Sequence, residues 1–183
     1  MTRTVVLIDG GYLSKILKNF FSSTKINLLL FSENLCDNSE RDQTLYYHCM
    51  PYQSRSPTYE ERRRYAAMDR FINIVRGLDK FTVKLGRLLK LSDGEYQQKG
   101  VDVVFALDLV ELSAMDEVDK AIIVSGDSDF VPAVEKANTL GVITQNVYHP
   151  NQFSYHLRDS CIESRTIDQA LIDSSLLIFE KKK

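Results

Sequence analysis

The chain has 183 residues, of which 44% are hydrophobic and 26% are charged, and its formal net charge is −2. This length allows one domain with a sizeable core, and the near-neutral charge excludes a broadly basic protein that coats nucleic acid. The three cysteines, Cys36, Cys49 and Cys161, stand far apart without a CxxC pair. Their spacing argues against a disulfide framework or a cysteine zinc site and predicts a reducing, cytoplasmic setting.

The first half of the chain alternates between apolar runs and amphipathic segments. TVVLI, residues 4–8, predicts a buried strand, and GGYLSKILKNFF after it predicts a helix. Asp9 ends the first apolar run, which is too short for a signal peptide or a membrane span. A short helix is expected over 26–35, a second strand over 44–50, a long helix over 59–78 and a third strand over 81–91.

The second half repeats this alternation. A loop over 92–100 leads to a helix over 101–115, and AIIV lies in a fourth strand over 120–125. The next helix follows SGDSDF and has Pro132 in its first turn, where the missing N–H costs little. A fifth strand is expected over 142–148. From residue 151 onward we expect one or two short helices and a tail ending in three lysines.

Acidic residues follow two of the predicted strands. Asp9 comes directly after the first strand, and Asp127 and Asp129 come directly after the fourth. In a parallel sheet with helices on both faces, ligands gather beyond the carboxyl ends of the strands, where the strand order reverses. If these two strands are neighbours, the three carboxylates meet. Asp102, at the start of the helix before the fourth strand, faces the same crevice.

Carboxylates gathered in this way repel one another, and some would bind protons unless a cation were present. Hard oxygen ligands around a small open site suit Mg²⁺ or Mn²⁺. The sequence therefore predicts a divalent-metal site that is built from Asp9, Asp102, Asp127 and Asp129.

Three segments in this order, IDGGYL, KGVDVVFALDLVEL and IIVSGDSDFVPAVEKANTLGV, resemble the NYN domain of the LabA-like group, in the PIN-like ribonuclease superfamily. The resemblance runs from about residue 4 to residue 148. It implies an α/β three-layer sandwich, in which helices flank a five-stranded, mainly parallel sheet of strand order 3-2-1-4-5. Residues 1–183 would form one domain, with 151–183 as a C-terminal helical extension and tail.

The same resemblance implies hydrolysis of RNA phosphodiester bonds with Mg²⁺ or Mn²⁺, and the four aspartates fall on the family's acidic positions. Asp127 is the first candidate for a direct metal ligand. One or two ions would activate water and screen the charge of the phosphate. Asp108 also falls on a commonly acidic position, but it lies about 120° round the helix from Asp102 and is given a supporting role. Ser125 and Lys99 are candidates for phosphate contacts.

A basic rim is the expected contact for RNA. Its candidate members are Arg62, Arg63, Arg64, Lys84 and Arg87. Glu60 and Glu61 directly precede the three arginines, and such charged runs are usually solvated helix faces. Single-stranded RNA is the expected partner, no membrane partner is expected, and a homodimer is left open.

Other folds also place carboxylates at the ends of strands. A dehalogenase-type phosphatase needs a second acid where this chain has Gly11, and a Toprim fold needs a glutamate where it has Asp9. The rival from another class is a catalytically silent NYN fold that binds RNA or a protein partner. The intact set of carboxylates argues against it, because an idle site has no reason to keep their repulsion.

Overall fold

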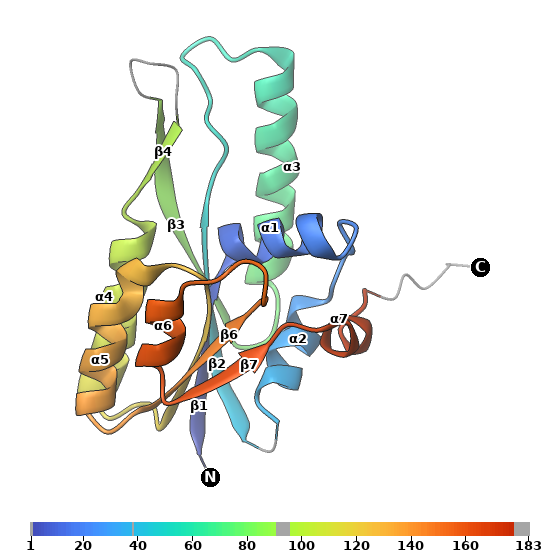
Figure 1. Ribbon diagram of the computed structural model, residues 1–183. Coiled ribbons are helices and arrows are strands. Elements are labelled where there is room, and N and C mark those ends of the chain that lie inside the picture. The colour runs from blue at the N-terminus through green and yellow to red at the C-terminus, as the bar shows by residue number, and fades with distance from the viewer. Residues whose placement is uncertain (1, 38, 91–95, 178–183) are drawn as a thin grey trace.

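A computed structural model describes residues 2–37, 39–90 and 96–177, without the side chains of 87–90 and 96–99 (Figure 1). A sheet of strand order β4-β3-β2-β1-β5-β6-β7 forms its centre. The strands are β1 (Arg3–Asp9), β2 (Glu40–Cys49), β3 (Phe81–Lys90), β4 (Tyr96–Lys99), β5 (Lys120–Val124), β6 (Ile143–Tyr148) and β7 (Glu163–Thr166). Neighbouring strands run parallel, except that β4 pairs antiparallel with β3.

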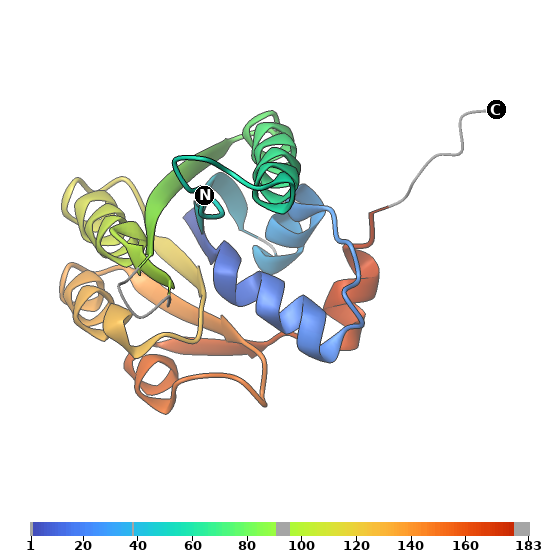
Figure 2. The same ribbon diagram turned by 90° about the horizontal axis from the view of Figure 1, so that it is seen from above.

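Helices connect the strands and cover both faces of the sheet. They are α1 (Gly10–Phe20), α2 (Leu28–Leu35), α3 (Tyr59–Arg76), α4 (Val101–Ala114), α5 (Val131–Thr139), α6 (Tyr155–Ser160) and α7 (Gln169–Ser174), with a short 3₁₀ helix η1 (Ser128–Phe130) before α5. In the view from above, α1, α2, α3 and α7 lie on one side of the sheet and α4, α5 and α6 on the other (Figure 2). The protein is therefore a three-layer sandwich.

The pleat of β1 divides the apolar residues between two cores. Val6 and Ile8 belong to the core on the side of α1, α2, α3 and α7. Val5 and Leu7 point to the other side, where Phe105 of α4 packs with residues of α5 and α6. Because β1 is buried on both faces, it appears in the sequence as an unbroken apolar run.

Polar caps and one proline define where helices begin. Asn27 accepts hydrogen bonds from the backbone at the start of α2. Thr58 and Glu61 form a reciprocal capping box at the start of α3, in which each side chain accepts from the backbone N–H of the other. Pro132 lies in the first turn of α5, as the sequence predicted.

The fold class and the strand order predicted from the sequence are confirmed. The five expected strands correspond to β3, β2, β1, β5 and β6 and lie in the order 3-2-1-4-5. Two further strands were not predicted. β4 falls in the segment predicted to be a loop, of which residues 91–95 lie outside the described residues, and β7 falls in a C-terminal part predicted to contain helices only. Both are polar, four-residue edge strands, YQQK and ESRT, without the apolar alternation that marks a strand.

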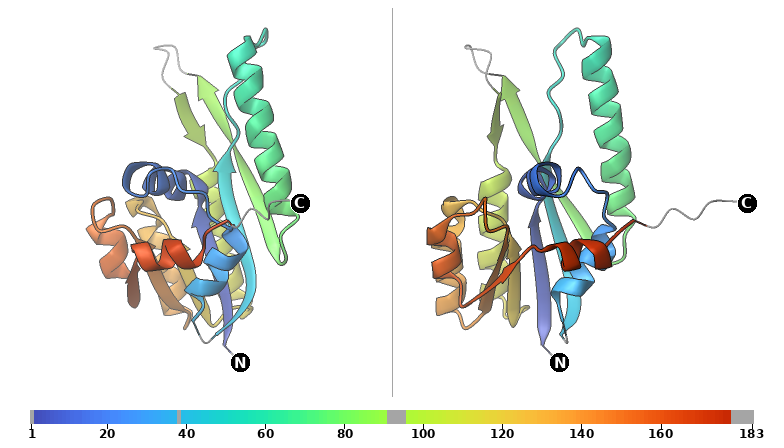
Figure 3. Two further views of the ribbon diagram at one scale, coloured as in Figure 1. Left: turned by 90° about the vertical axis from the view of Figure 1, so that its right-hand side faces the viewer. Right: turned by 45° about the vertical axis from the view of Figure 1, so that its right-hand side comes forward.

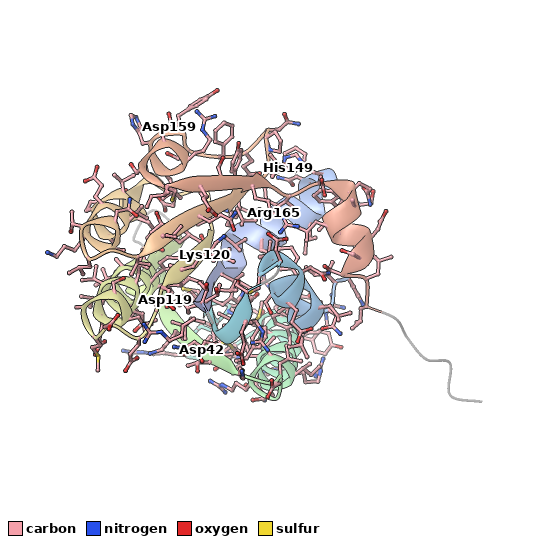
Figure 4. All side chains as sticks on the ribbon, turned by 90° about the horizontal axis from the view of Figure 1, so that it is seen from below. Asp42, Asp119, Lys120, His149, Asp159 and Arg165 are labelled. Carbon is pink, nitrogen blue, oxygen red and sulfur yellow. The ribbon has the colours of Figure 1, made fainter. Side chains whose placement is uncertain are left out.

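The amino ends of the strands carry charged residues that pair with one another. The guanidinium of Arg3 lies 2.8 Å from the carboxylate of Asp119, and the ammonium of Lys120 lies 2.7 Å from that of Glu163. Figure 4 views the molecule from this end and labels Asp119, Lys120 and Asp42. Exposed pairs of this kind contribute little stability, so we assign this end no functional role.

The thiols of Cys36, Cys49 and Cys161 are free. Burial raises the pKa of each to about 11, so none is a reactive thiolate at neutral pH. In the described part of the chain, none of the helices combines the length and the apolar character needed to cross a membrane.

Candidate active site

The residues that follow β1 and β5 meet at the carboxyl end of the sheet, because these two strands pair in parallel. Asp9 ends β1 and also caps α1, where its Oδ1 accepts a hydrogen bond of 2.9 Å from the backbone N–H of Tyr12. Asp127 caps η1 after β5, and its Oδ1 accepts a hydrogen bond of 3.0 Å from the backbone N–H of Asp129. Both carboxylates are thus held by the backbone of the turn that follows them.

Ser125 joins these two turns. Its side chain is fully buried, and its hydroxyl donates a hydrogen bond of 3.3 Å to Oδ2 of Asp9. The same hydroxyl accepts a hydrogen bond of 3.2 Å from the backbone N–H of Asp127. The hydroxyl therefore points inward and positions the two aspartates, which differs from the phosphate contact expected from the sequence.

A pocket of 390 Å³ lies between these turns and α4. Asp9 and Asp127 line it from the ends of β1 and β5, and Asp102 lines it from the first turn of α4. The remaining lining residues are Gly11, Tyr12, Lys15, Gly126, Ser128, Gln152 and Phe153. Three of the four predicted carboxylates therefore border one pocket, at the carboxyl end where parallel sheets bind their ligands.

Burial and mutual repulsion perturb the carboxyl groups of this pocket. Burial raises the pKa of Asp9 and the charge of Asp127 adds to this effect, although the hydrogen bonds that Asp9 accepts act in the opposite direction. Burial also raises the pKa of Asp102, and the charges of Asp127, Asp9 and Asp129 add to it. Asp102 is therefore within electrostatic reach of the other three aspartates.

The carboxylates do not form a closed metal cluster. Among residues 2–37, 39–90 and 96–177, no three histidine, cysteine, aspartate or glutamate side chains lie close enough together to hold one ion. Asp129 is exposed and borders a neighbouring pocket together with Asp102 and Lys136. The acidic pocket is thus an open group of hard oxygen donors, and divalent cations prefer such donors. An ion bound there would need further ligands besides these carboxylates.

Asp108 lies away from the acidic pocket. Its carboxylate accepts a hydrogen bond of 2.9 Å from the hydroxyl of Tyr47 and lies 3.5 Å from the ammonium of Lys84. Asp108 and Lys84 border a separate pocket of 400 Å³. Asp108 and Asp102 therefore lie apart, which agrees with the angle of about 120° between them on the helix.

The residues expected to form a basic rim are divided between the two faces of the sheet. Arg62, Arg63 and Arg64 are exposed on α3, which packs on the face of α1 and α2. Lys84 points to the opposite face, where it pairs with Asp108 of α4. The arginines therefore share one helix, and Lys84 does not join them.

Arg87 and Lys99 face each other in the register of β3 and β4. Their side chains lie outside the described part of the structure, so their predicted roles remain predictions. The β3–β4 hairpin and α3 both extend beyond the carboxyl ends of the other strands (Figure 3). The hairpin would therefore approach a ligand in the acidic pocket from beyond the carboxyl ends of the strands.

The model of the NYN domain family matches residues 3–168. This protein belongs to the NYN domain family. A curated relative from Sinorhizobium fredii (strain NBRC 101917 / NGR234), the uncharacterized protein y4oD, is 32% identical over 68 residues, which are 37% of this chain and 30% of that relative. The match thus spans less than a third of y4oD.

A solved structure supports the same fold. The crystal structure of VPA0982, a protein of unknown function from Vibrio parahaemolyticus RIMD 2210633, is similar to this NYN domain with a TM-score of 0.69. The likeness covers 96% of both chains at 23% sequence identity. At this identity the likeness shows the fold alone, which is the PIN-like nuclease fold that family membership suggests.

The sequence analysis did not predict several of the residues that line the pocket of this NYN domain. Lys15 reaches it from α1, and Gln152 and Phe153 reach it from the segment between β6 and α6. Lys15 lies four positions after Gly11 on the same helix face, so the helical period could have indicated it. Nothing in the local sequence indicates the segment of Gln152, because its position depends on the packing of distant elements.

Proposed function

We propose that this NYN domain is a metal-dependent ribonuclease that hydrolyses phosphodiester bonds of single-stranded RNA at the acidic pocket. The observation that carries this proposal is that Asp9, Asp102 and Asp127 border one pocket at the carboxyl end of the sheet. The three come from different elements, and burial together with the charges of neighbouring aspartates raises the pKa of Asp9 and of Asp102. Carboxyl groups that are perturbed in this way and line a pocket are typical of functional sites.

The donor set fits Mg²⁺ or Mn²⁺, because these ions prefer carboxylate oxygens in an open, hydrated site. Asp127 and Asp9 would hold the ion, with Asp102 and Asp129 completing the acidic environment. When bound, the ion would supply an activated water molecule and neutralise charge on the phosphate. The NYN and PIN-like proteins are generally metal-using nucleases, which agrees with this assignment.

The protein's own groups have distinct tasks in this proposal. Ser125 keeps Asp9 and Asp127 in a fixed relation through its two hydrogen bonds. Lys15 places a positive charge on a wall of the same pocket, and no ion pair within the described residues involves it. Lys15 would contact a non-bridging oxygen of the RNA phosphate. Arg62, Arg63 and Arg64 would attract the RNA backbone from α3.

The second candidate is an NYN fold that binds RNA without cleaving it. One observation favours it: in the described part of the chain, no three potential ligands are close enough to hold an ion together. A nuclease would need a small movement of the acidic side chains when the ion and the RNA bind. A module that only binds RNA would not need this movement.

Cleavage of labelled single-stranded RNA, with Mn²⁺ or with EDTA, separates the two. Asp127→Asn should lower the cleavage rate at least about 100-fold, because loss of even an outer-shell partner of a metal costs roughly 10–100-fold. RNA affinity should change little. Asp42→Asn makes the same chemical change at the other end of the sheet and is the control. Wild-type protein that binds RNA and never cleaves it with Mn²⁺ or Mg²⁺ would identify the binding module.

A further inference from the structure

An aromatic cluster lies at the start of α6. The ring of Phe153 packs between those of Tyr148 and Tyr155, with centroid distances of 4.6 Å and 4.7 Å. The guanidinium carbon of Arg158 lies 5.2 Å from the centroid of Phe153 and 5.2 Å from that of Tyr155. Asp159 accepts a hydrogen bond of 2.7 Å from Nε of Arg158 and thereby fixes the orientation of the guanidinium. The four side chains form one connected group of flat surfaces.

This cluster is continuous with the acidic pocket. Phe153 lines the pocket itself, together with Gln152, Asp9 and Asp127. The hydroxyl of Tyr12 donates a hydrogen bond of 2.6 Å to the carbonyl oxygen of Gln152, so α1 holds this segment in place. The connection from β6 to α6 begins at the carboxyl end of β6, as Figure 1 shows.

The outer part of the cluster is open to solvent. Tyr155 is 65% exposed. Its exposure is not needed for the fold, because Leu157 is the residue that α6 buries in the core. An exposed tyrosine beside an arginine suits a flat, polarisable ligand, since base stacking and cation–π contacts both need open ring faces.

We propose that Tyr155, supported by Phe153 and Arg158, forms a base-stacking platform that holds an unpaired base of single-stranded RNA next to the acidic pocket. The proposal rests on the proposed function, and it adds a position for the substrate. A nucleobase on this platform would place its own phosphate or the adjacent one toward Lys15 and the carboxylates. Bases in an RNA duplex are already stacked and paired, so the platform selects single strands over duplexes.

Binding in EDTA tests the platform without cleavage. Fluorescence anisotropy of a labelled single-stranded oligoadenylate should give a dissociation constant about tenfold higher for Tyr155→Ala than for wild type, since one stacked base is worth roughly 1–3 kcal/mol. Tyr155→Phe should bind like wild type. Tyr59→Ala is the matched control, because Tyr59 is 70% exposed and does not line the pocket.

A tryptophan at the same position reports stacking directly, because the chain contains no tryptophan of its own. Emission from Tyr155→Trp should fall when oligoadenylate is added, and it should change far less with an abasic oligonucleotide of equal length and charge. Met115→Trp, at an exposed position after α4, provides the control for non-specific quenching. Equal quenching by the two oligonucleotides, or equal affinity of Tyr155→Ala and Tyr59→Ala, would overturn the platform.

The experiments can contradict the platform proposal and the ribonuclease proposal independently of each other. If Tyr155→Ala weakens oligoadenylate binding in EDTA while wild type never cleaves RNA with Mn²⁺, the platform holds and the ribonuclease proposal fails. If wild type cleaves RNA and Tyr155→Ala binds and cleaves equally well, the ribonuclease proposal holds and the platform fails. A duplex of the same length should bind more weakly than the single strand, and equal binding would also contradict the platform.

Discussion

The hydroxyl of Tyr12 donates a hydrogen bond of 2.6 Å to the carbonyl oxygen of Gln152, which lies 140 positions further along the chain. The same hydroxyl accepts a hydrogen bond of 3.0 Å from the backbone N–H of His149. Tyr12 is buried, and burial raises its pKa to about 12, so it stays protonated and keeps donating at physiological pH. One side chain from α1 thus fixes the segment that forms a wall of the acidic pocket.

Tyr12→Phe should loosen this wall while it keeps the ring in place. Two backbone groups, at His149 and Gln152, lose their partner, which should lower the free energy of unfolding by about 1–3 kcal/mol. Hydrogen exchange at residues 149–153 should become faster, and RNA cleavage should fall with it. Exchange that stays at the wild-type rate would mean that other contacts hold this segment.

Gly126→Ala should disturb the pocket from the β5 side. A Cβ at this position would lie 2.7 Å from Cε2 of Tyr12 and 3.3 Å from the carbonyl oxygen of Gln152. Tyr12 or the segment of Gln152 must therefore move, at a cost of roughly 1–3 kcal/mol in stability. Gly77→Ala is the control, because its added Cβ would meet only backbone oxygens at 3.4 Å and 3.7 Å. Thermal melts and RNA cleavage of both variants measure the difference.

The pH dependence of stability without metal should reveal the strain on Asp102. Its pKa is raised above 3.8 in the folded chain, so the folded state binds the proton more tightly than the unfolded state does. This contribution to stability is complete below pH 3.8 and is lost as the pH rises through the folded-state pKa. At pH 7 in EDTA, Asp102→Asn should therefore melt at a higher temperature than wild type. The gain should be on the order of 1–2 °C, since solvent screens this partly exposed group.

The melting temperatures of wild type and Asp102→Asn should become equal at acidic pH, where both side chains are neutral. Addition of Mn²⁺ at neutral pH should raise the melting temperature of wild type more than that of Asp102→Asn, because the ion binds only the folded state and relieves the repulsion there. A stabilisation by Mn²⁺ that is the same in both proteins would place the ion away from Asp102.

The central fold could be predicted because its strands bury both faces. β1 and β5 are unbroken apolar runs, and their polar ends mark where Asp9 and Asp127 stand. The strands that were missed, β4 and β7, lie at the two edges of the sheet and are short and polar. Pairing with one neighbour stabilises such strands, and the amino-acid pattern carries no record of that pairing.

Part of the candidate site could also be predicted from the sequence. Residues that directly follow adjacent parallel strands must lie close together. The sequence could therefore predict that Asp9 and Asp127 are neighbours. The wall formed by Gln152 and Phe153 depends on how α1 packs against the connection from β6 to α6, a contact between segments far apart in sequence. The separation of Lys84 from the arginines of α3 follows from which way one residue of β3 points, and the composition of the chain does not record that direction.

Ser125→Ala should uncouple the two acidic turns without removing an acidic group. The hydroxyl of Ser125 hydrogen-bonds to Asp9 and to the backbone of Asp127, and its bond to Asp9 lowers the pKa of that carboxyl. Without it, the pKa of Asp9 should rise further above its ordinary value. Because catalysis by the proposed mechanism needs ionised Asp9, the acidic limb of the pH–rate profile should move to higher pH.

The acidic limb should move by on the order of one pH unit, because one hydrogen bond to a charged group is worth about 1.5–3 kcal/mol and one pH unit corresponds to about 1.4 kcal/mol. Ser113→Ala serves as the control, since Ser113 is also buried and donates its hydroxyl to the carbonyl oxygen of Leu109 inside α4. That variant should lose some stability and keep the wild-type pH profile. If both serine variants move the acidic limb equally, or neither does, the link between Asp9 and Asp127 through Ser125 has no part in catalysis.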